Sequence, residues 1–459
     1  MILPLYDEVI FRQKLKFTFA KVGPAKEMMF KCVTDVDDDP FIDDTGVNQG
    51  YQRRCPHCGG RLSSAVGYAQ EIVIALTGAP RAGKTSCLTA VIRALSGYTF
   101  QGLSMEIPNN DPLWQKLALE VDKFDHSIKV EKTPMDQSDV PAYSFLVNIG
   151  KEKRVMTFVD MPGEFWMGNH GLTKEFHTQY MGLYRNIDCI WLFISKLTVH
   201  EEALTAATPK VQKVINEAGD MSTSDLSNTH SAAMLLAHNL ESLCGYLVSL
   251  GEKVPPVAVI MTKAEADLGD GQEIREQGIF PVNTRRSVNE INQREMRMVM
   301  PYVNDSFCIN EYEYYRRSIK IREYIGSKHH VLLQRIENSI RSRTYIAMAA
   351  YGHPAKDPVI GERPAIHPPE SFHELFPLIW TLAITGTVLV RHGVVKIRKN
   401  IFGSISSEET FQNCRFDYRF MPQFKNKKEN TRQQAMWSNI RKNLLSAASV
   451  YHSTQVQAD

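Results

Sequence analysis

Residues 78–85 carry the chemistry of a phosphate-binding loop, Gly-Ala-Pro-Arg-Ala-Gly-Lys-Thr. An apolar stretch precedes this loop (71–77) and a helix-like stretch follows it (86–95). Glycines allow backbone angles that aim N–H groups at phosphate oxygens, and the N-terminus of the following helix adds a positive dipole end. In this pattern Lys84 reaches the β- and γ-phosphates, and the Thr85 hydroxyl coordinates Mg²⁺. The candidate nucleotide-binding residues here are Gly78, Ala79, Pro80, Arg81, Ala82, Gly83, Lys84, Thr85 and Ser86.

A second motif supplies a carboxylate for the metal. Asp160 ends an apolar stretch (154–160) and opens the pattern Asp-Met-Pro-Gly. In GTP-hydrolysing proteins this Asp holds Mg²⁺ through water, and the glycine N–H, here that of Gly163, senses the γ-phosphate. ATP-hydrolysing proteins more often have a second acid at the position of Met161. Glu164 follows directly and is a candidate for orienting the attacking water, with a helix-start glutamate as the equal alternative.

A third motif concerns the nucleotide base. Thr262, Lys263 and Glu265 follow an apolar stretch in the order of the guanine-reading sequence [NT]KxD. In that sequence the lysine stem covers the base, and the acid accepts hydrogen bonds from guanine N1–H and the 2-amino group. Adenine lacks both donors. Glu265 stands where Asp is expected, and Asp267 is the rival acceptor, so the sequence leaves two candidates for reading the base.

Apolar stretches alternate with helix-like stretches from residue 71 onward. This alternation predicts an α/β domain with a mostly parallel sheet. Two of the stretches, separated only by residues 150–153, predict an antiparallel hairpin at one sheet edge. We expect a P-loop NTPase three-layer sandwich with a mixed six-stranded sheet and helical insertions. The predicted strands are 71–77, 142–149, 154–160, 189–195, 257–262 and 344–350.

The three motifs in this order resemble a Ras-like P-loop GTPase of the translation-factor-related class, over roughly residues 71–390. The segments CPHCGGRL (55–62), DMPGE (160–164) and FPLIWTLA (376–383) are similar to bacterial zinc-ribbon double-GTPases of conflict and defence systems. The resemblance implies a switch threonine that contacts Mg²⁺ and the γ-phosphate, and Thr133 is the best-placed match. It also implies a backbone N–H that meets the guanine oxygen, which matches Ala350. The expected cofactors are GTP or GDP and Mg²⁺.

Cysteine spacing predicts a second kind of metal site. Cys55 and Cys58 flank a turn with the sequence Cys-Pro-His-Cys-Gly-Gly, which is half of a zinc ribbon. Cys32 is a candidate third ligand. The fourth ligand is His57, an Asp or absent, and a metal-free ribbon is the alternative. Zinc at this site would be structural, because nothing nearby in the sequence provides for an activated water.

The overall composition and charge narrow the class of protein that carries these motifs. The chain has 459 residues with a net charge of +2, and 43% of the residues are hydrophobic. This balance shows no overall bias toward nucleic acid or a membrane. Dilute cysteines and the absence of a signal-peptide pattern predict a cytoplasmic protein without a membrane partner. The apolar segment 375–390 is shorter than a membrane span and is expected to form a buried helix.

We expect three parts along the chain. Residues 1–66 form a zinc-ribbon-like module, residues 70–390 form the GTPase domain, and residues 391–459 form a basic tail with a net charge of +7. Insertions are expected at about 196–256 and 268–343.

Three functions fit this arrangement. The first is a molecular switch that hydrolyses GTP slowly without a partner, in a bacterial defence or regulatory complex. Its partner would be a second GTPase or another conflict-system component. The second is a non-catalytic GTP-binding scaffold, which the departures at Glu164 and Glu265 keep open. The third is a nucleic-acid-associated NTPase that uses the ribbon and the basic tail.

Overall fold

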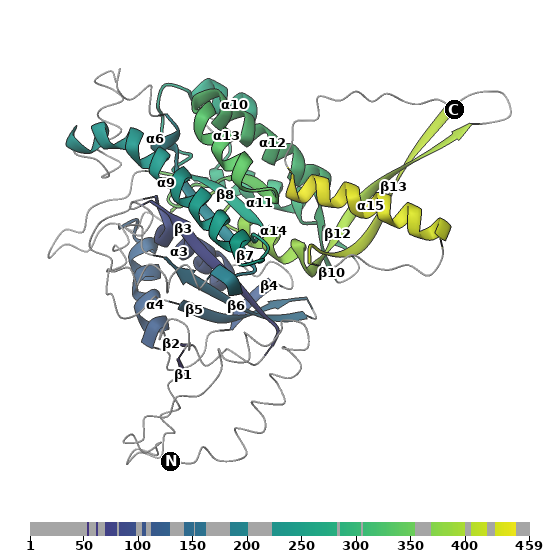
Figure 1. Ribbon diagram of the computed structural model, residues 1–459, viewed down its shortest axis with the longest axis horizontal. Helices are drawn as coiled ribbons and strands as arrows, with labels where there is room; N and C mark the ends of the chain where they lie inside the picture. Colours follow the sequence, from purple (N-terminus) through teal and green to yellow (C-terminus); the bar gives the residue numbers. More distant parts are fainter. Residues whose placement is uncertain are drawn as a thin grey trace, which may run out of the picture.

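The computed structural model describes most of the chain from residue 69 to residue 446. The described residues are 53–54, 61–62, 69–79, 82–97, 103–106, 112–128, 142–150, 152–161, 184–200, 223–281, 285–303, 306–353, 369–399, 405–419 and 427–446. They form an α/β domain with a β-hairpin that extends away from its body (Figure 1).

A seven-stranded sheet in the order β11-β8-β7-β3-β6-β5-β4 forms the centre of this domain. Its strands are β3 (Glu71–Gly78), β4 (Leu103–Glu106), β5 (Ala142–Ile149), β6 (Glu152–Asp160), β7 (Cys189–Ser195), β8 (Val257–Thr262) and β11 (Arg343–Ala347). The five strands from β11 to β6 run parallel, and β5 and β4 pair antiparallel at the edge. The predicted α/β sandwich and the predicted β5–β6 hairpin are confirmed.

The sheet has seven strands where the sequence predicts six. The additional strand is β4, a four-residue edge strand in which only Leu103 is buried. A strand this short, with polar residues exposed toward water, has no apolar run to reveal it. The last predicted strand (344–350) is shorter in the structure, because β11 ends at Ala347.

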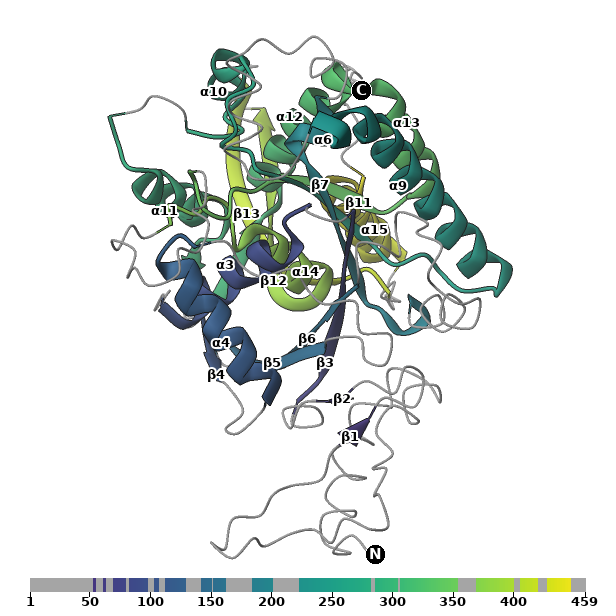
Figure 2. The same ribbon diagram turned by 90° about the vertical axis from the view of Figure 1, so that its left-hand side faces the viewer.

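Helices cover both faces of the sheet, because the central strands are apolar on both faces. Along β3, Ile72, Ile74 and Leu76 join one hydrophobic cluster, whereas Val73 and Ala75 join the other. The first cluster includes residues of α3 (Lys84–Gly97), α4 (Pro112–Asp125) and α14 (Phe376–Ile384). The second includes residues of α9 (Thr223–Ser249), α12 (Glu311–Lys328) and α13 (His330–Ser339). Figure 2 shows α3 and α4 on one side of the strands and α9 and α13 on the other.

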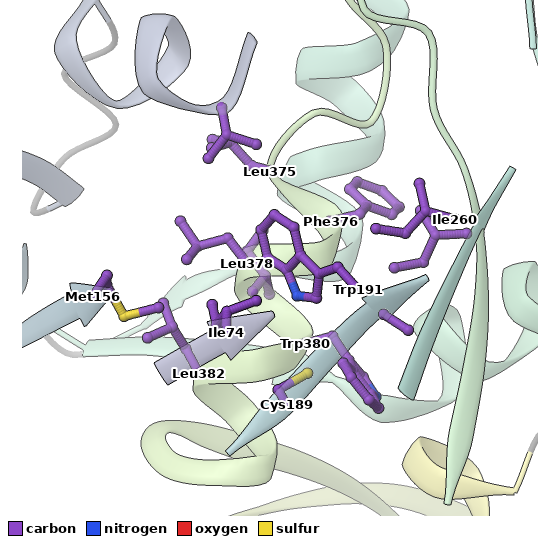
Figure 3. Packing of buried hydrophobic residues seen from close by; sticks show 14 of the residues in the cluster. Ile74, Met156, Cys189, Trp191, Ile260, Leu375, Phe376, Leu378, Trp380 and Leu382 are labelled. Carbon is purple, nitrogen blue, oxygen red and sulfur yellow. The ribbon is translucent and has the colours of Figure 1, made fainter. Parts of the chain in front are cut away.

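Helix α14 is buried along its whole length. Figure 3 shows its side chains Leu378, Trp380 and Leu382 gathered with Trp191 of β7 and Ile74 of β3. The expected buried helix over 375–390 is therefore present but shorter, since it ends at Ile384. The chain continues directly into a strand at Thr385, and Gly386 in this strand has a φ of +74°. Among the described residues, no helix is both long and apolar enough to cross a membrane.

A second sheet, in the order β13-β12-β10-β9, lies beyond α14. It contains β9 (Tyr302–Val303), β10 (Ser306–Asn310), β12 (Thr385–Lys399) and β13 (Ile405–Asp417). Helix α15 (Lys427–Leu445) follows the hairpin, and the indole N–H of Trp380 in α14 donates to the carbonyl of Leu444 in α15 at 2.7 Å. The remaining helices are α6 (Lys196–Val199), α10 (Gly271–Gln277) and α11 (Val288–Val299), with the 3-10 helix η3 at Tyr184–Asn186.

The basic segment 391–459 differs from the expected tail, because its described residues form ordered strands and a helix. Tyr418 donates its hydroxyl to the carbonyl of Asp188 at 3.1 Å, and Arg419 forms an ion pair of 3.2 Å with the Asp188 carboxylate. Ile440 and Leu444 are buried in the core of the domain. Charge composition does not reveal these few long-range contacts, which fix a polar segment to the sheet.

A short two-stranded ladder surrounds the predicted zinc turn. Strands β1 (Arg53–Arg54) and β2 (Arg61–Leu62) pair antiparallel. Cys32, Cys55, His57 and Cys58 lie outside the described residues. Within the described part of the chain, no group of three or more His, Cys, Asp and Glu side chains could hold a metal ion. Zinc therefore remains a prediction for this segment.

The contact between α14 and the sheet gives a stability prediction. Thr381 accepts a hydrogen bond from the indole N–H of Trp191 at 3.0 Å and donates to the carbonyl of Pro377. We expect Thr381→Val to lower the free energy of unfolding by about 1–3 kcal/mol, because the buried indole N–H loses its acceptor. Chemical denaturation measures this loss.

Thr89→Val is the matched control. Thr89 is also fully buried in a helix and donates to the carbonyl four residues earlier, that of Thr85. It should therefore lose less stability than Thr381→Val. Equal losses in the two variants would contradict the role given to the Trp191 contact.

Candidate functional site

Loops from four parallel strands meet at one edge of the central sheet. Strands β3, β6, β7 and β8 end at Gly78, Asp160, Ser195 and Thr262. Register pairs join Gly78 to Phe193 and Ser195 to Thr262, so these ends lie side by side. Ligands of open α/β sheets bind at the carboxyl ends of the strands. All three sequence motifs are thus brought to the same edge.

Gly78 and Gly83 give the phosphate-binding loop its shape. A Cβ atom on Gly78 would lie 2.5 Å from the carbonyl oxygen of Phe193, so no larger residue fits beside β7. Gly83 has a φ of +84°, which L side chains rarely adopt. Helix α3 begins directly after it at Lys84. The loop therefore closes tightly on β7 and leads into a helix N-terminus, which favours an anion.

Lys84, Thr85 and Asp160 lie together at this loop. The ammonium of Lys84 donates to the carbonyls of Gly78 at 3.1 Å and Ala79 at 3.3 Å, so it extends across the loop. The Thr85 hydroxyl lies 3.4 Å from a carboxylate oxygen of the fully buried Asp160. A hydroxyl and a carboxylate are hard oxygen donors of the kind that Mg²⁺ prefers. These two residues therefore fit a magnesium ion.

The segment 262–267, which is predicted to read the base, is hydrogen-bonded to the phosphate loop. Thr262 donates its hydroxyl to the carbonyl of Ala82 at 2.7 Å, and the same hydroxyl lies 3.4 Å from the carbonyl of Ile194. Thr262 is 1% exposed, so this hydrogen bond is formed away from water. Ala82 belongs to the phosphate loop and Thr262 to the base motif. One hydroxyl thus fixes the distance between the two halves of the site.

The two candidate base readers differ in their surroundings. Glu265 is partly buried, and its Oε2 atom has no hydrogen-bond partner among the described residues. Burial raises the pKa of Glu265 to about 7, and its backbone hydrogen bond and the charges of Lys263 and Lys196 act in the opposite direction. Asp267 is exposed and accepts a local hydrogen bond from the N–H of Gly269 at 3.0 Å. These differences favour Glu265 as the acceptor for a base.

Lys263 adopts a φ of +56°, the left-handed region that favours glycine. The N–H of Ala266 donates to the carbonyl of Lys263 at 3.0 Å and closes a turn around Glu265. Backbone strain of this kind is found mainly at ligand-binding sites. The turn determines where the lysine stem and the glutamate carboxylate are presented.

The segment after β11 lies beside this turn. Ala264 donates its N–H to the carbonyl of Met348 at 3.4 Å. The hydroxyl of Ser371 donates to the carbonyl of Ala350 at 2.6 Å, and Ala349 pairs with Phe372 in an isolated bridge. Ala350 is thus held near the base-reading turn by residues about twenty positions later in the chain. No motif in the sequence points to Ser371 and Phe372, because a segment that supports a loop through backbone contacts has no sequence pattern of its own.

Sequence analysis also missed a buried ion pair behind the turn. The ammonium of Lys196 lies 3.0 Å from a carboxylate oxygen of Asp270. A signal was available, because Lys196 directly follows an apolar strand as Lys263 does. Other predicted site residues lie outside the described part of the chain, namely Pro80, Arg81, Thr133, Gly163 and Glu164. Ser86 is described and lies in the first turn of α3.

A phosphate loop between a parallel strand and a helix, with a buried carboxylate at the end of the adjacent strand, is the arrangement of a P-loop NTPase. Residues 72–299 match the model of the Double-GTPase 2 family. The chain is a P-loop GTPase of the double-GTPase type, and thus a GTP-binding protein. The matched segment contains the phosphate loop, Asp160 and the base-reading turn. Strand β11 and the C-terminal hairpin lie beyond it.

Other comparisons add little to this assignment. No curated protein is significantly similar to this chain in sequence. Among solved structures, the G domain of the T. maritima FeoB iron transporter matches with 14% sequence identity and a TM-score of 0.19. That match covers 45% of this chain and 82% of the other chain. The assignment therefore depends on the family match and on the geometry of the sheet and the site.

The close approach at Gly78 gives a second prediction. We expect Gly78→Ala to lower the free energy of unfolding by roughly 1–3 kcal/mol, because the added Cβ would overlap the carbonyl of Phe193. The same change should weaken nucleotide binding. Thermal denaturation and nucleotide titration measure the two effects.

Gly251→Ala controls for the backbone conformation. Gly251 has a φ of +73° and nothing within 4 Å of an added Cβ. This variant should retain nucleotide affinity. If it lost affinity as strongly as Gly78→Ala does, the effect would not come from the contact with β7.

Proposed function

We propose that this protein binds GTP with Mg²⁺ and hydrolyses it slowly to GDP as a molecular switch. The observation that carries the proposal is the hydrogen bond from Thr262 to the carbonyl of Ala82. It joins a phosphate loop and a base-reading turn into one site, as a bound nucleoside triphosphate requires. The match to a double-GTPase family supports guanine as the base.

Each residue has a chemical role in this proposal. Lys84 leaves its two loop carbonyls to neutralise charge on the β- and γ-phosphates. Thr85 and Asp160 would hold Mg²⁺, which supplies charge neutralisation at the phosphates when it is bound. Lys263 covers one face of the base with its aliphatic stem. Glu265 accepts hydrogen bonds from the guanine N1–H and 2-amino groups.

Recognition of the γ-phosphate and its hydrolysis depend on three further residues, which lie outside the described part of the chain. Thr133 and Gly163 are proposed to sense the γ-phosphate, and Glu164 to orient the attacking water. Charge on Glu164 near the γ-phosphate would slow hydrolysis until a partner binds. A non-catalytic GTP-binding scaffold is the alternative, and the glutamate at this position is what favours it.

The wider setting follows from the family and from the sequence resemblance. We propose a cytoplasmic regulatory or defence complex in which a second GTPase or another protein is the partner. A structural zinc held by Cys32, Cys55 and Cys58 is part of this proposal, supported by the β1–β2 pairing on either side of the cysteine turn. Association with nucleic acid through the basic C-terminal segment is the weaker alternative, since that segment packs against the domain.

Hydrolysis of GTP tests the enzymatic part. We expect purified protein with Mg²⁺ to prefer GTP over ATP and to release phosphate slowly. Lys84→Ala should abolish release, because the ammonium of Lys84 lies at the carbonyls of Gly78 and Ala79 in the phosphate loop, where it can neutralise the β- and γ-phosphates. Single-turnover phosphate release is the measurement, with Lys153→Ala as the control on an exposed lysine.

Binding of GTP without release by the wild type would favour the scaffold. Binding of ATP in preference to GTP would overturn the proposal.

The raised pKa of Glu265 gives a pH prediction. Guanine donors need an ionised acceptor, and a pKa of about 7 leaves much of this carboxyl protonated at lower pH. GTP affinity should therefore rise by about tenfold between pH 6 and pH 8 as the carboxyl loses its proton. Isothermal titration over this range measures the trend.

Two variants distinguish Glu265 from Asp267 as the acceptor for the base. Glu265→Gln should bind GTP more weakly and remove the part of the pH dependence that Glu265 causes, whereas phosphate titration persists in every variant. Asp267→Asn should resemble the wild type. The reverse result would assign base reading to Asp267.

A further inference from the structure

A fully buried lysine lies behind the base-reading turn. Lys196 is the first residue after β7, and its side chain has no solvent exposure. The register pair of Ser195 with Thr262 places it next to the point where the base-reading turn begins. Burying an ammonium is costly unless it is paired and hydrogen-bonded. The contacts that Lys196 makes therefore indicate the structural role of its buried charge.

The ammonium of Lys196 holds the turn at two points. It donates to the backbone carbonyl of Ala266, which directly follows Glu265. It also donates to a carboxylate oxygen of Asp270 at 3.0 Å. Asp270 is the last residue before α10. The side chain of Lys196 thus fixes both the residue next to the proposed base reader and the end of the loop that carries it.

Asp270 is itself held by residues from two other elements. Its second carboxylate oxygen accepts the hydroxyl of Tyr324 in α12 and lies 3.2 Å from Nε2 of His200. His200 and Tyr324 also contact each other at 2.6 Å. Burial acts to raise the pKa of Asp270, but the hydrogen bonds of His200, Tyr324 and Lys196 and the charge of Lys196 hold it well below its usual range. Asp270 therefore favours its ionised form and pairs with the ammonium of Lys196.

Lys196 also acts on Glu265 through charge. Its ammonium and that of Lys263 both favour the ionised form of Glu265 against the effect of burial. The interaction is mutual, because burial lowers the pKa of Lys196 and the charges of Asp270, Glu265 and Asp267 oppose that change. An ionised Glu265 is the form that accepts hydrogen bonds from guanine.

We propose that Lys196 is a positioning residue for guanine recognition. It fixes the carbonyl of Ala266 and the carboxylate of Asp270 so that Glu265 presents its carboxylate to the base. Lys196 does not touch the nucleotide. The inference rests on the proposed GTP-binding function and adds to it the residue that determines base selectivity from outside the motif.

Base selectivity distinguishes positioning from general stability. The probes are GTP, ITP, which lacks the 2-amino group, and ATP, each with Mg²⁺. In Lys196→Met we expect the ratio of GTP to ITP affinity to fall by about tenfold, because the charge-assisted hydrogen bond to the 2-amino group is lost. Affinity for ATP, which depends on the phosphate loop, should change little.

Lys328→Met is the matched control. Its ammonium pairs with Glu273 of α10 at 2.6 Å, so it also ties α12 to α10, but beyond the 263–270 loop. This variant should keep the wild-type ratio. If Lys196→Met retains the ratio as well, or loses affinity for all three nucleotides equally, the positioning role is wrong. If the wild type itself shows no preference for GTP, the proposed function fails instead.

A milder variant tests the same inference if Lys196→Met does not fold. Tyr324→Phe keeps the ring and removes only the hydroxyl that Asp270 accepts. It should lower the GTP to ITP ratio in the same direction by a smaller factor, with circular dichroism unchanged. A wild-type ratio in folded Tyr324→Phe, together with one in any folded Lys196→Met, would overturn the inference.

Discussion

Covering both faces of five parallel strands is the constraint on which this structure depends. Strands β3, β7 and β8 are buried on both faces, so helices must pack on each side of the sheet. Part of that cover comes from a segment late in the chain, because α14 supplies a fully buried helix to one face. The hairpin and α15 are fixed to the domain as a consequence. The segment 385–446 is thus joined to the nucleotide-binding sheet through the core itself.

The same burial leaves the strand ends as the place for polar chemistry. Backbone groups within the sheet are paired, whereas the loops after β3, β6, β7 and β8 present theirs at one edge. Gly78 lets the phosphate loop approach β7, and Thr262 ties that loop to the base-reading turn. The spacing between phosphates and base is therefore set by two short-range contacts rather than by flexible loops.

Two groups of polar and charged side chains lie near this edge of the sheet. Lys84, Thr85 and Asp160 face the proposed phosphate and metal, where charge changes when a nucleotide binds. Lys196 and Asp270, which hold the loop 263–270, form a separate pair that stays buried. A low-dielectric setting strengthens such a pair but makes each partner costly when it is alone. This explains why Lys196 of α6 and Tyr324 of α12 both contact Asp270 at the end of the loop 263–270.

The sequence alone determined the sheet class, the phosphate loop, the carboxylate that ends the adjacent strand and the order of the motifs. Those features are local, because glycine spacing and apolar runs act within a few residues of the chain. Only the tertiary structure distinguishes Glu265 from Asp267, because Glu265 is partly buried whereas Asp267 is exposed. It also showed that described residues of the basic C-terminal segment pack against the domain, and it revealed Ser371, Lys196 and Asp270. Their partners lie far away in the chain, and a hydrogen bond between distant segments leaves no periodic signal in either of them.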